Sequence, residues 1–268
     1  MECLSTINSL KINLKKNIGT ILIVVEGGSD EFELFKHIFR DILHYKYTEK
    51  TRLKSRFKNY EFVMKGNESS RVIVINAKNS NINTLKKDKE YLNDIYIDLY
   101  NEYGIDIKNI NVYFVWDRDH SSNSVVDVKE LLCLLTNSLD NKDGEMNGLL
   151  LLSYPALESY IISCYEKNTL LLKETDLKEY NKKHKYLIKN IDKNMLLKAT
   201  TSMHRVLNKL EITEYNLEDF KETSSKIFNK QEEILKIKNY YYLLSMISLI
   251  FVDLGIITEK WTLILEIF

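Results

Sequence analysis

The chain has 268 residues, of which 44% are hydrophobic and 28% are charged, a balance typical of a folded globular protein and not of a disordered one. Its 38 Lys and Arg residues equal its 38 Asp and Glu residues, so the net charge does not indicate a nucleic-acid partner, although a neutral protein can still carry a basic face. The 3 cysteines fit neither a disulfide framework nor a zinc spacing, which favours a reducing cytoplasm.

The beginning of the chain predicts an N-terminal helix and no signal peptide. Residues 20–25 (TILIVV) then form an apolar run rich in β-branched side chains, which predicts a strand buried on both faces. A turn follows at residues 26–30 (EGGSD). Between Phe32 and Ile42 apolar side chains recur at helical spacing, so a helix is expected there.

The same unit recurs along the chain. Residues 71–75 (RVIVI), 112–116 (VYFVW) and 148–153 (GLLLLS) are further apolar runs, and each precedes a segment with helical periodicity. Strands that alternate with helices favour an α/β fold with a mostly parallel sheet, here of four strands flanked by helices. We expect this unit within residues 1–165 and an all-helical C-terminal region over residues 166–268, packed together as one body.

The most apolar stretch, residues 240–252 (YYYLLSMISLIFV), lies in the C-terminal region. It is shorter than the roughly 20 residues that span a bilayer, so we expect no membrane association. A buried helix is the expected structure, and a surface that docks a partner or a second copy of the chain is the alternative.

Carboxylates follow three of the four predicted strands. Glu26 and Asp30 come after the first, Asp117 and Asp119 after the third, and Glu158 just past the fourth. Ligands of an open parallel sheet bind at the carboxyl ends of its strands, so these side chains should meet at one edge. Because like charges repel, a divalent cation would stabilise the cluster, and oxygen ligands suit Mg²⁺ or Mn²⁺.

The spacing within each pair supports this interpretation. Residues i and i+2 of a strand point to the same side, so Asp117 and Asp119 can face one ion. Glu26 lies in the turn, and Asp30 can reach back from the first helical turn, whose N-terminus also favours anions. Ordinary alternatives remain open: helix capping for Glu26 and Asp30, a polar loop for the Asp pair, and a surface helix position for Glu158.

Two basic stretches could contact nucleic acid. In the first, alternating cations would line one face of an extended segment and could follow phosphates, although a solvated surface is an equal alternative. This stretch contains Lys50, Arg52, Lys54 and Arg56. In the second, a solvated helix surface is the preferred interpretation. It contains Lys182, Lys183, Lys185, Lys189 and Lys193, with His204 and Arg205 further on.

Several of these segments resemble a known family. VVEGGSD at 24–30 and VWDRDH at 115–120 resemble the Glu motif and the Asp-x-Asp motif of Toprim domains. The similarity is closer to the OLD-family nucleases and to the Toprim effector subunit of PARIS-type anti-phage systems. There, AKNSNI at 77–82 resembles a Gly-Gly-Lys-x-Asn-Ile segment, and LESY at 157–160 resembles the context of a further Glu. The resemblance covers about residues 18–165.

The resemblance implies a Toprim-like catalytic domain that cleaves phosphodiesters with a bound metal. Asp117 and Asp119 would hold Mg²⁺ or Mn²⁺, and Glu26 would be a shared ligand or the general base. Asp30 and Glu158 would complete the metal site, and Lys78 would be the catalytic lysine. The family lysine falls at Asn79 of this chain, one position later than Lys78, which leaves the role of a lysine open.

The resemblance also implies a cytoplasmic endonuclease that cleaves RNA, such as tRNA, or DNA as an effector of anti-phage defence. The sequence has no Gly-x-x-x-x-Gly-Lys-Ser/Thr loop, so a separate ABC-type ATPase is the expected partner. A homodimer is a further expectation. The alternatives are a housekeeping RNA-processing Toprim nuclease and a non-catalytic Toprim-like module that binds nucleic acid or a partner.

Overall fold

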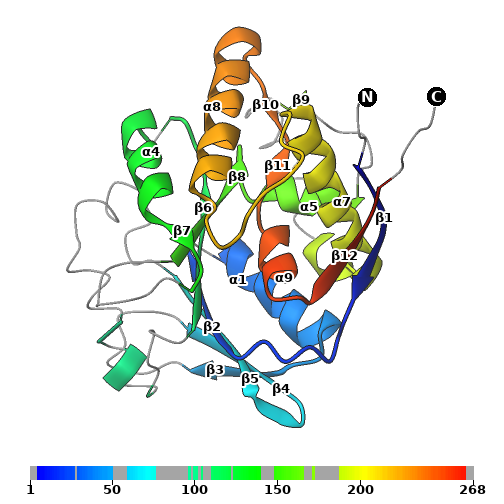
Figure 1. Cartoon of the computed structure of the whole chain (residues 1–268). Coiled ribbons are helices and arrows are strands. Elements are labelled where there is room, and N and C mark those ends of the chain that lie inside the picture. Colours follow the sequence, from blue (N-terminus) through cyan, green and yellow to red (C-terminus); the bar gives the residue numbers. More distant parts are fainter. Residues whose placement is uncertain are drawn as a thin grey trace.

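The computed structural model describes residues 5–27, 29–50, 59–76, 96–97, 99–101, 104, 110–121, 123–139, 148–165, 171–172 and 187–263. Within these residues the fold is mixed α/β around an eight-stranded sheet. Figure 1 shows the sheet in the middle of the molecule, with helices packed on both sides.

The centre of the sheet is parallel and its margins are antiparallel. Strands β8 (Gly148–Tyr154), β6 (Asn111–Asp117), β2 (Thr20–Val25) and β5 (Asn67–Asn76) lie side by side in this order and run parallel. They contain the four apolar runs of the sequence. β2 is buried from Ile21 to Val25, as expected of a strand with helices on both of its faces.

Four shorter or more polar strands extend this centre, so the expected four-stranded sheet was too small. β4 (Asn59–Met64) pairs antiparallel with β5, and β3 (Lys46–Lys50) pairs with β4. On the other side β11 (Leu244–Ser245) and β7 (Thr136–Asn137) both pair antiparallel with β8. Charged side chains in β3 and the two-residue length of β7 and β11 hide these strands from a hydrophobicity pattern.

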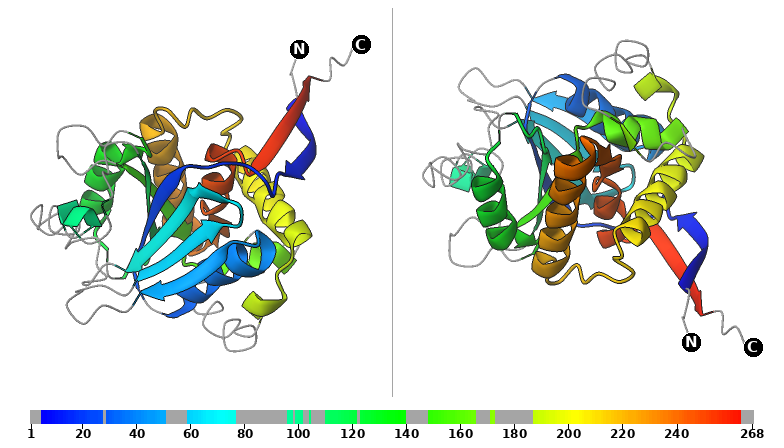
Figure 2. Two further views of the ribbon diagram at one scale, coloured as in Figure 1. Left: turned by 90° about the horizontal axis from the view of Figure 1, so that it is seen from below. Right: turned by 90° about the horizontal axis from the view of Figure 1, so that it is seen from above.

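The helices form a layer on each face of the sheet (Figures 1 and 2). α4 (Val125–Leu134) and α8 (Lys221–Lys238) cover one face. The other face carries α1 (Ser29–Lys36) with its π-helical continuation His37–Ile42, and α5 (Glu158–Tyr165). α7 (Lys193–Lys209), preceded by a 3-10 turn at Leu187–Asn190, and α9 (Ser248–Asp253) complete this second layer. The helix expected over Phe32–Ile42 is therefore present, with a π-helical second half.

The C-terminal region is not all-helical, which corrects the expectation. Within residues 240–252 only α9 is helical, while β10 (Tyr241–Tyr242) pairs with β9 (Leu171–Leu172) and β11 joins the main sheet. The stretch is buried nonetheless. Leu196, Ile227 and Phe251 of this region share one hydrophobic core with the strands of the sheet.

The N-terminal helix is also absent, because residues 5–12 form strand β1 (Ser5–Ile12). β1 pairs antiparallel with β12 (Ile257–Leu263), from the opposite end of the chain. Figure 2 shows this two-stranded ribbon extending away from the body. Pairing between such distant segments leaves no local signal in the sequence.

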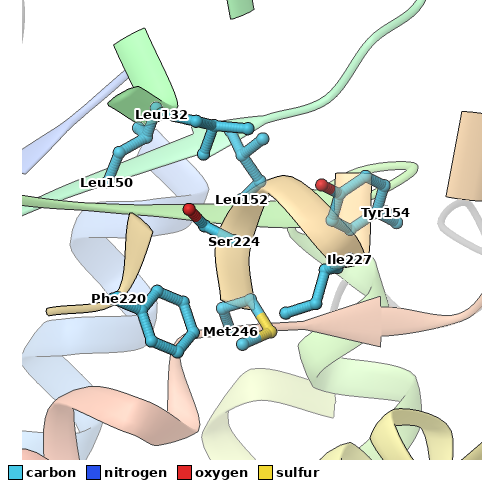
Figure 3. A pocket seen from close by; sticks show the side chains of 8 residues that line it. All are labelled: Leu132, Leu150, Leu152, Tyr154, Phe220, Ser224, Ile227 and Met246. Carbon is cyan, nitrogen blue, oxygen red and sulfur yellow. The ribbon is translucent and has the colours of Figure 1, made fainter. Parts of the chain in front are cut away.

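One small cavity lies between β8 and the layer of α4 and α8 (Figure 3). Its volume is about 10 Å³, and seven of its eight lining side chains are apolar or aromatic, among them Leu152, Phe220 and Ile227. This is room for about one water molecule, so the cavity is a packing gap and not a ligand site. No helix in the described ranges is both long and apolar enough to cross a membrane.

Candidate metal and catalytic site

Carboxylates meet where the parallel strands end. Glu26 directly follows β2, Asp117 is the last residue of β6, and Glu158 is the first residue of α5. The Asp117 backbone N–H donates to Oε2 of Glu26 over 2.8 Å, and the Leu157 N–H donates to Oδ1 of Asp117 over 2.8 Å. These bonds tie the ends of β2, β6 and β8 together, so Glu26 and Asp117 are adjacent, as the sequence predicts.

The pKa values of Glu26 and Asp117 are raised, because the site disfavours their ionised forms. Burial raises the pKa of Glu26 to about 7; the Asp117 N–H lowers it, and the charges of Glu31 and Asp119 raise it. Burial also raises the pKa of Asp117 well above its usual range, and the charges of Glu26, Glu158 and Glu31 add to that rise. Like charges that share a partly desolvated site disfavour the ionised forms. In the ranges that the structure describes, the negative charge of this cluster is therefore not balanced by positive charge.

Glu31 belongs to the cluster, although the sequence pattern does not indicate it. It lies beside Asp30 in the first turn of α1, and burial raises its pKa, as do the charges of Asp30 and Glu158. Its position directly after Asp30 at a helix start was the available signal. Helical periodicity made it look like an ordinary surface acid, because the pattern ranks apolar positions and not where a polar side chain ends.

Asp119 is placed differently from the expectation. β6 ends at Asp117, so Asp119 is not part of the strand. The prediction that both aspartates point to the same side, as residues i and i+2 of one strand, was therefore wrong. Its φ is 21°, its N–H donates to the Pro155 carbonyl over 3.3 Å, and Ser121 donates to its Oδ1 through N–H and hydroxyl. Asp119 still raises the pKa of Glu26, so it lies at the margin of the cluster.

The residue between the two aspartates points to the opposite face of the sheet. Arg118 is buried and makes two parallel hydrogen bonds to Glu232 of α8, of 2.7 and 2.9 Å. Its third bond reaches the Asn123 carbonyl, and its guanidinium stacks 5.2 Å from the ring centre of Phe228. Through Arg118, α8 therefore fixes the Asp117–Asp119 segment from the opposite face of the sheet. The sequence pattern did not indicate this role.

The donor set fits a hard divalent cation. Within the described part of the chain, each of the two central carboxylates keeps one oxygen, Oε1 of Glu26 and Oδ2 of Asp117, that accepts none of the hydrogen bonds. Asn76 lies level with Val25 on the neighbouring strand, and its buried Oδ1 has no hydrogen-bond partner in that part of the chain. Carboxylate and amide oxygens are ligands of Mg²⁺ and Mn²⁺.

These groups do not form a finished metal centre. Among the described residues no three His, Cys, Asp or Glu side chains are arranged to hold a metal ion. To hold an ion, several carboxylate side chains would have to turn toward one point, namely those of Glu26, Asp117, Glu158 and Glu31. The fit therefore rests on the donor chemistry and on the excess of negative charge.

Four further candidate residues lie outside the described residues: Lys78, Arg52, Lys54 and Arg56. Lys50 is described through its backbone as the last residue of β3. It pairs with Asn59, which pairs with Ile75 near the end of β5. The chain thus leaves β3 and enters β4 at the edge of the sheet where the carboxylates meet.

Comparison with known proteins assigns no family, because no family model, no curated protein and no solved structure matches this chain.

The Arg118–Glu232 pair yields a first prediction. Replacing Glu232 by Ala leaves the buried guanidinium without its carboxylate and should lower the free energy of unfolding by about 3 kcal/mol, measured by urea denaturation. Glu233→Ala, at an exposed neighbouring position of α8, is the control and should change stability by less than about 0.5 kcal/mol. A similar small effect of both substitutions would show that the Arg118–Glu232 pair does not stabilise the fold.

A second prediction concerns pH. Because the pKa of Glu26 is raised from 4.5 to about 7 in the folded state, the folded protein holds this proton more tightly than the unfolded chain. Stability from Glu26 is then complete below about pH 4.5 and is lost as the pH rises to about 7, a change of about 3 kcal/mol without divalent cations.

Glu26→Gln should flatten this part of the stability profile, since an amide cannot titrate. Urea denaturation of both proteins in EDTA across this pH range measures the difference. An unchanged slope in the variant would show that Glu26 does not carry the raised pKa.

Proposed function

We propose that this protein is a metal-dependent endonuclease of the Toprim type that uses Mg²⁺ or Mn²⁺. The observation that carries the proposal is the joined pair Glu26 and Asp117, with raised pKa values, at the carboxyl ends of neighbouring parallel strands. The order of the segments supports it further: a Glu after β2, an Asp-x-Asp segment that begins with the last residue of β6, and a Glu after β8, on the parallel centre β8-β6-β2-β5.

Asp117 and Glu158 would hold the cation, with Glu31 as an additional ligand or hydrogen-bond acceptor and Glu26 as a shared ligand or the general base. When bound, such an ion polarises a phosphoryl oxygen and lowers the pKa of a coordinated water. Asp117 is fixed in place by the Leu157 N–H, which leaves its second carboxylate oxygen for a ligand. Asp30 and Asp119 lie next to these groups and would adjust the charge of the site.

Glu26 suits the role of general base in this proposal. A base works best when its pKa lies near the working pH, and the pKa of Glu26 is about 7 while no cation is bound. Its Oε2 accepts from the Asp117 N–H, and its Oε1 would take a proton from an attacking water. Lys78 remains a candidate for stabilising the developing negative charge, without a position in the described structure.

The proposed substrate is RNA or DNA. The stretch of Lys50, Arg52, Lys54 and Arg56 begins at the edge of the sheet that carries the carboxylates, because Lys50 ends β3 there. Cations of this stretch would contact backbone phosphates of the substrate. By its resemblance to PARIS-type effectors, the protein would act in anti-phage defence, and a separate ABC-type ATPase would control it.

A third prediction tests the activity. Incubation with Mg²⁺ or Mn²⁺ and labelled RNA, DNA and tRNA should give internal cleavage, followed on denaturing gels. Asp117→Asn and Glu26→Gln should each reduce the cleavage rate by about 10²-fold or more, since they remove a metal ligand and the general base.

Glu222→Gln removes an exposed carboxylate of α8 and is the control, which should cleave like the unaltered protein. All variants should first show unchanged circular dichroism. Binding of the substrates without any cleavage, in either metal, would contradict the proposal and favour a non-catalytic Toprim-like module.

A further inference from the structure

Helix α7 has an unusual distribution of charge for a neutral chain. Over its 17 residues, Lys193–Lys209, it contains four cations and no Asp or Glu. Its apolar side faces the core, where Leu196, Met203 and Val206 are buried. The cations therefore concentrate on the outer side of the helix and produce a local positive field, although the whole chain carries a net charge of zero.

A cavity of about 310 Å³ lies against this helix. Its lining consists of Ser163 from α5 and a row of α7 side chains: Asn194, Leu197, Lys198, Thr201, Ser202 and Arg205. The α7 positions recur every three or four residues, so they form a single face of the helix. The lining contains two cations and no acid, which makes the cavity suitable for an anion.

The spacing of the two cations that line this cavity, named here the α7 groove, suits an extended anion. Lys198 and Arg205 are both exposed and are seven residues apart, which is about 10 Å along the helix axis. Cations spaced along a helix in this way need not bind one phosphate group together. They can instead contact different phosphates of one strand. Arg205 has five N–H donors, so it can bind a phosphate while it also bonds to another residue of this chain.

A second cavity of similar size provides a contrast within the same molecule. It has a volume of about 380 Å³ and lies beyond the C-terminal end of α7. Four carboxylates line it, from Glu211, Glu214, Asp219 and Glu222, together with Lys226. A polyanion would be repelled there, so the α7 groove is favoured among these two cavities.

We propose that the α7 groove binds the phosphate backbone of a single-stranded nucleic acid through Lys198 and Arg205. This rests on the proposed function insofar as the bound strand would be the substrate. Helix α5 links the two places, because it begins at Glu158 and contributes Ser163, about 7.5 Å further along its axis, to the groove. The strand would thus be held on the C-terminal region while it is cleaved at the end of the sheet.

The test measures binding without cleavage. Fluorescence anisotropy follows the full-length protein binding labelled single-stranded RNA or DNA of about 16 nucleotides, in EDTA, across a range of salt concentrations. Lys198→Glu/Arg205→Glu should weaken binding and make the slope of log K against log salt shallower by about 1.4, since each lost phosphate contact removes about 0.7. The control, Lys129→Glu/Lys236→Glu, changes the charge equally at exposed positions of α4 and α8 and should keep the slope.

Three outcomes would overturn the proposal: no binding by the unaltered protein, equal effects of the two double variants, or binding of a mononucleotide with no binding of the oligonucleotide. Unchanged circular dichroism of both variants excludes misfolding as the cause of a loss. Because cleavage plays no part in the assay, a protein that binds through α7 and never cleaves would refute the endonuclease alone. An active nuclease whose binding ignores Lys198 and Arg205 would refute the groove alone.

Discussion

The repulsion between buried carboxylates at the end of the sheet is the constraint on which the account of this protein depends. Glu26 and Asp117 are joined through a backbone hydrogen bond, and Glu31 and Glu158 add their charges to the same small region. Burial removes the water that would screen these charges, so the carboxyls retain protons to unusually high pH. A fold gains no stability from such a cluster by itself, which is why we propose a bound cation.

The rest of the structure explains how the chain tolerates this cluster. The parallel strands β2 and β6 bring Glu26 and Asp117 to one edge, and backbone N–H groups satisfy one oxygen of each. On the opposite face Arg118 is fixed by Glu232 and Phe228 of α8. The C-terminal region therefore supports the candidate site directly, so the molecule does not consist of a catalytic unit with an independent appendage.

The sequence allowed prediction of those parts that local patterns determine. The four parallel strands were predictable because buried parallel strands are continuous apolar runs, and β2, with TILIVV, is the clearest case. The meeting of Glu26 and Asp117 followed from their positions at the carboxyl ends of two parallel strands. The edge strands β3 and β11 and the β1–β12 ribbon were missed, since short or charged strands depend on partners that lie far away in the sequence.

Single side chains were harder to predict than strands. The Asp-x-Asp spacing predicts a strand position for Asp119, but β6 ends two residues earlier, in a turn where the Asp119 N–H bonds to Pro155. The buried pair of Arg118 and Glu232 joins residues of two distant elements, and no spacing rule connects them. Glu31 was passed over because a carboxylate at a helix start is usually solvated, and only the packing of α1 against the strand ends brings it into the cluster.

The most direct test of the central claim is calorimetric titration of the protein with Mn²⁺ and Mg²⁺ in buffers of different ionisation enthalpy. Because a ligand carboxyl must lose its proton, binding in the range up to about 1 mM should release protons, and more of them at about pH 6 than at about pH 8. Asp117→Asn should abolish this binding. The account would be contradicted by an absence of binding, or by binding that releases no protons at the lower pH and persists in the Asp117→Asn variant.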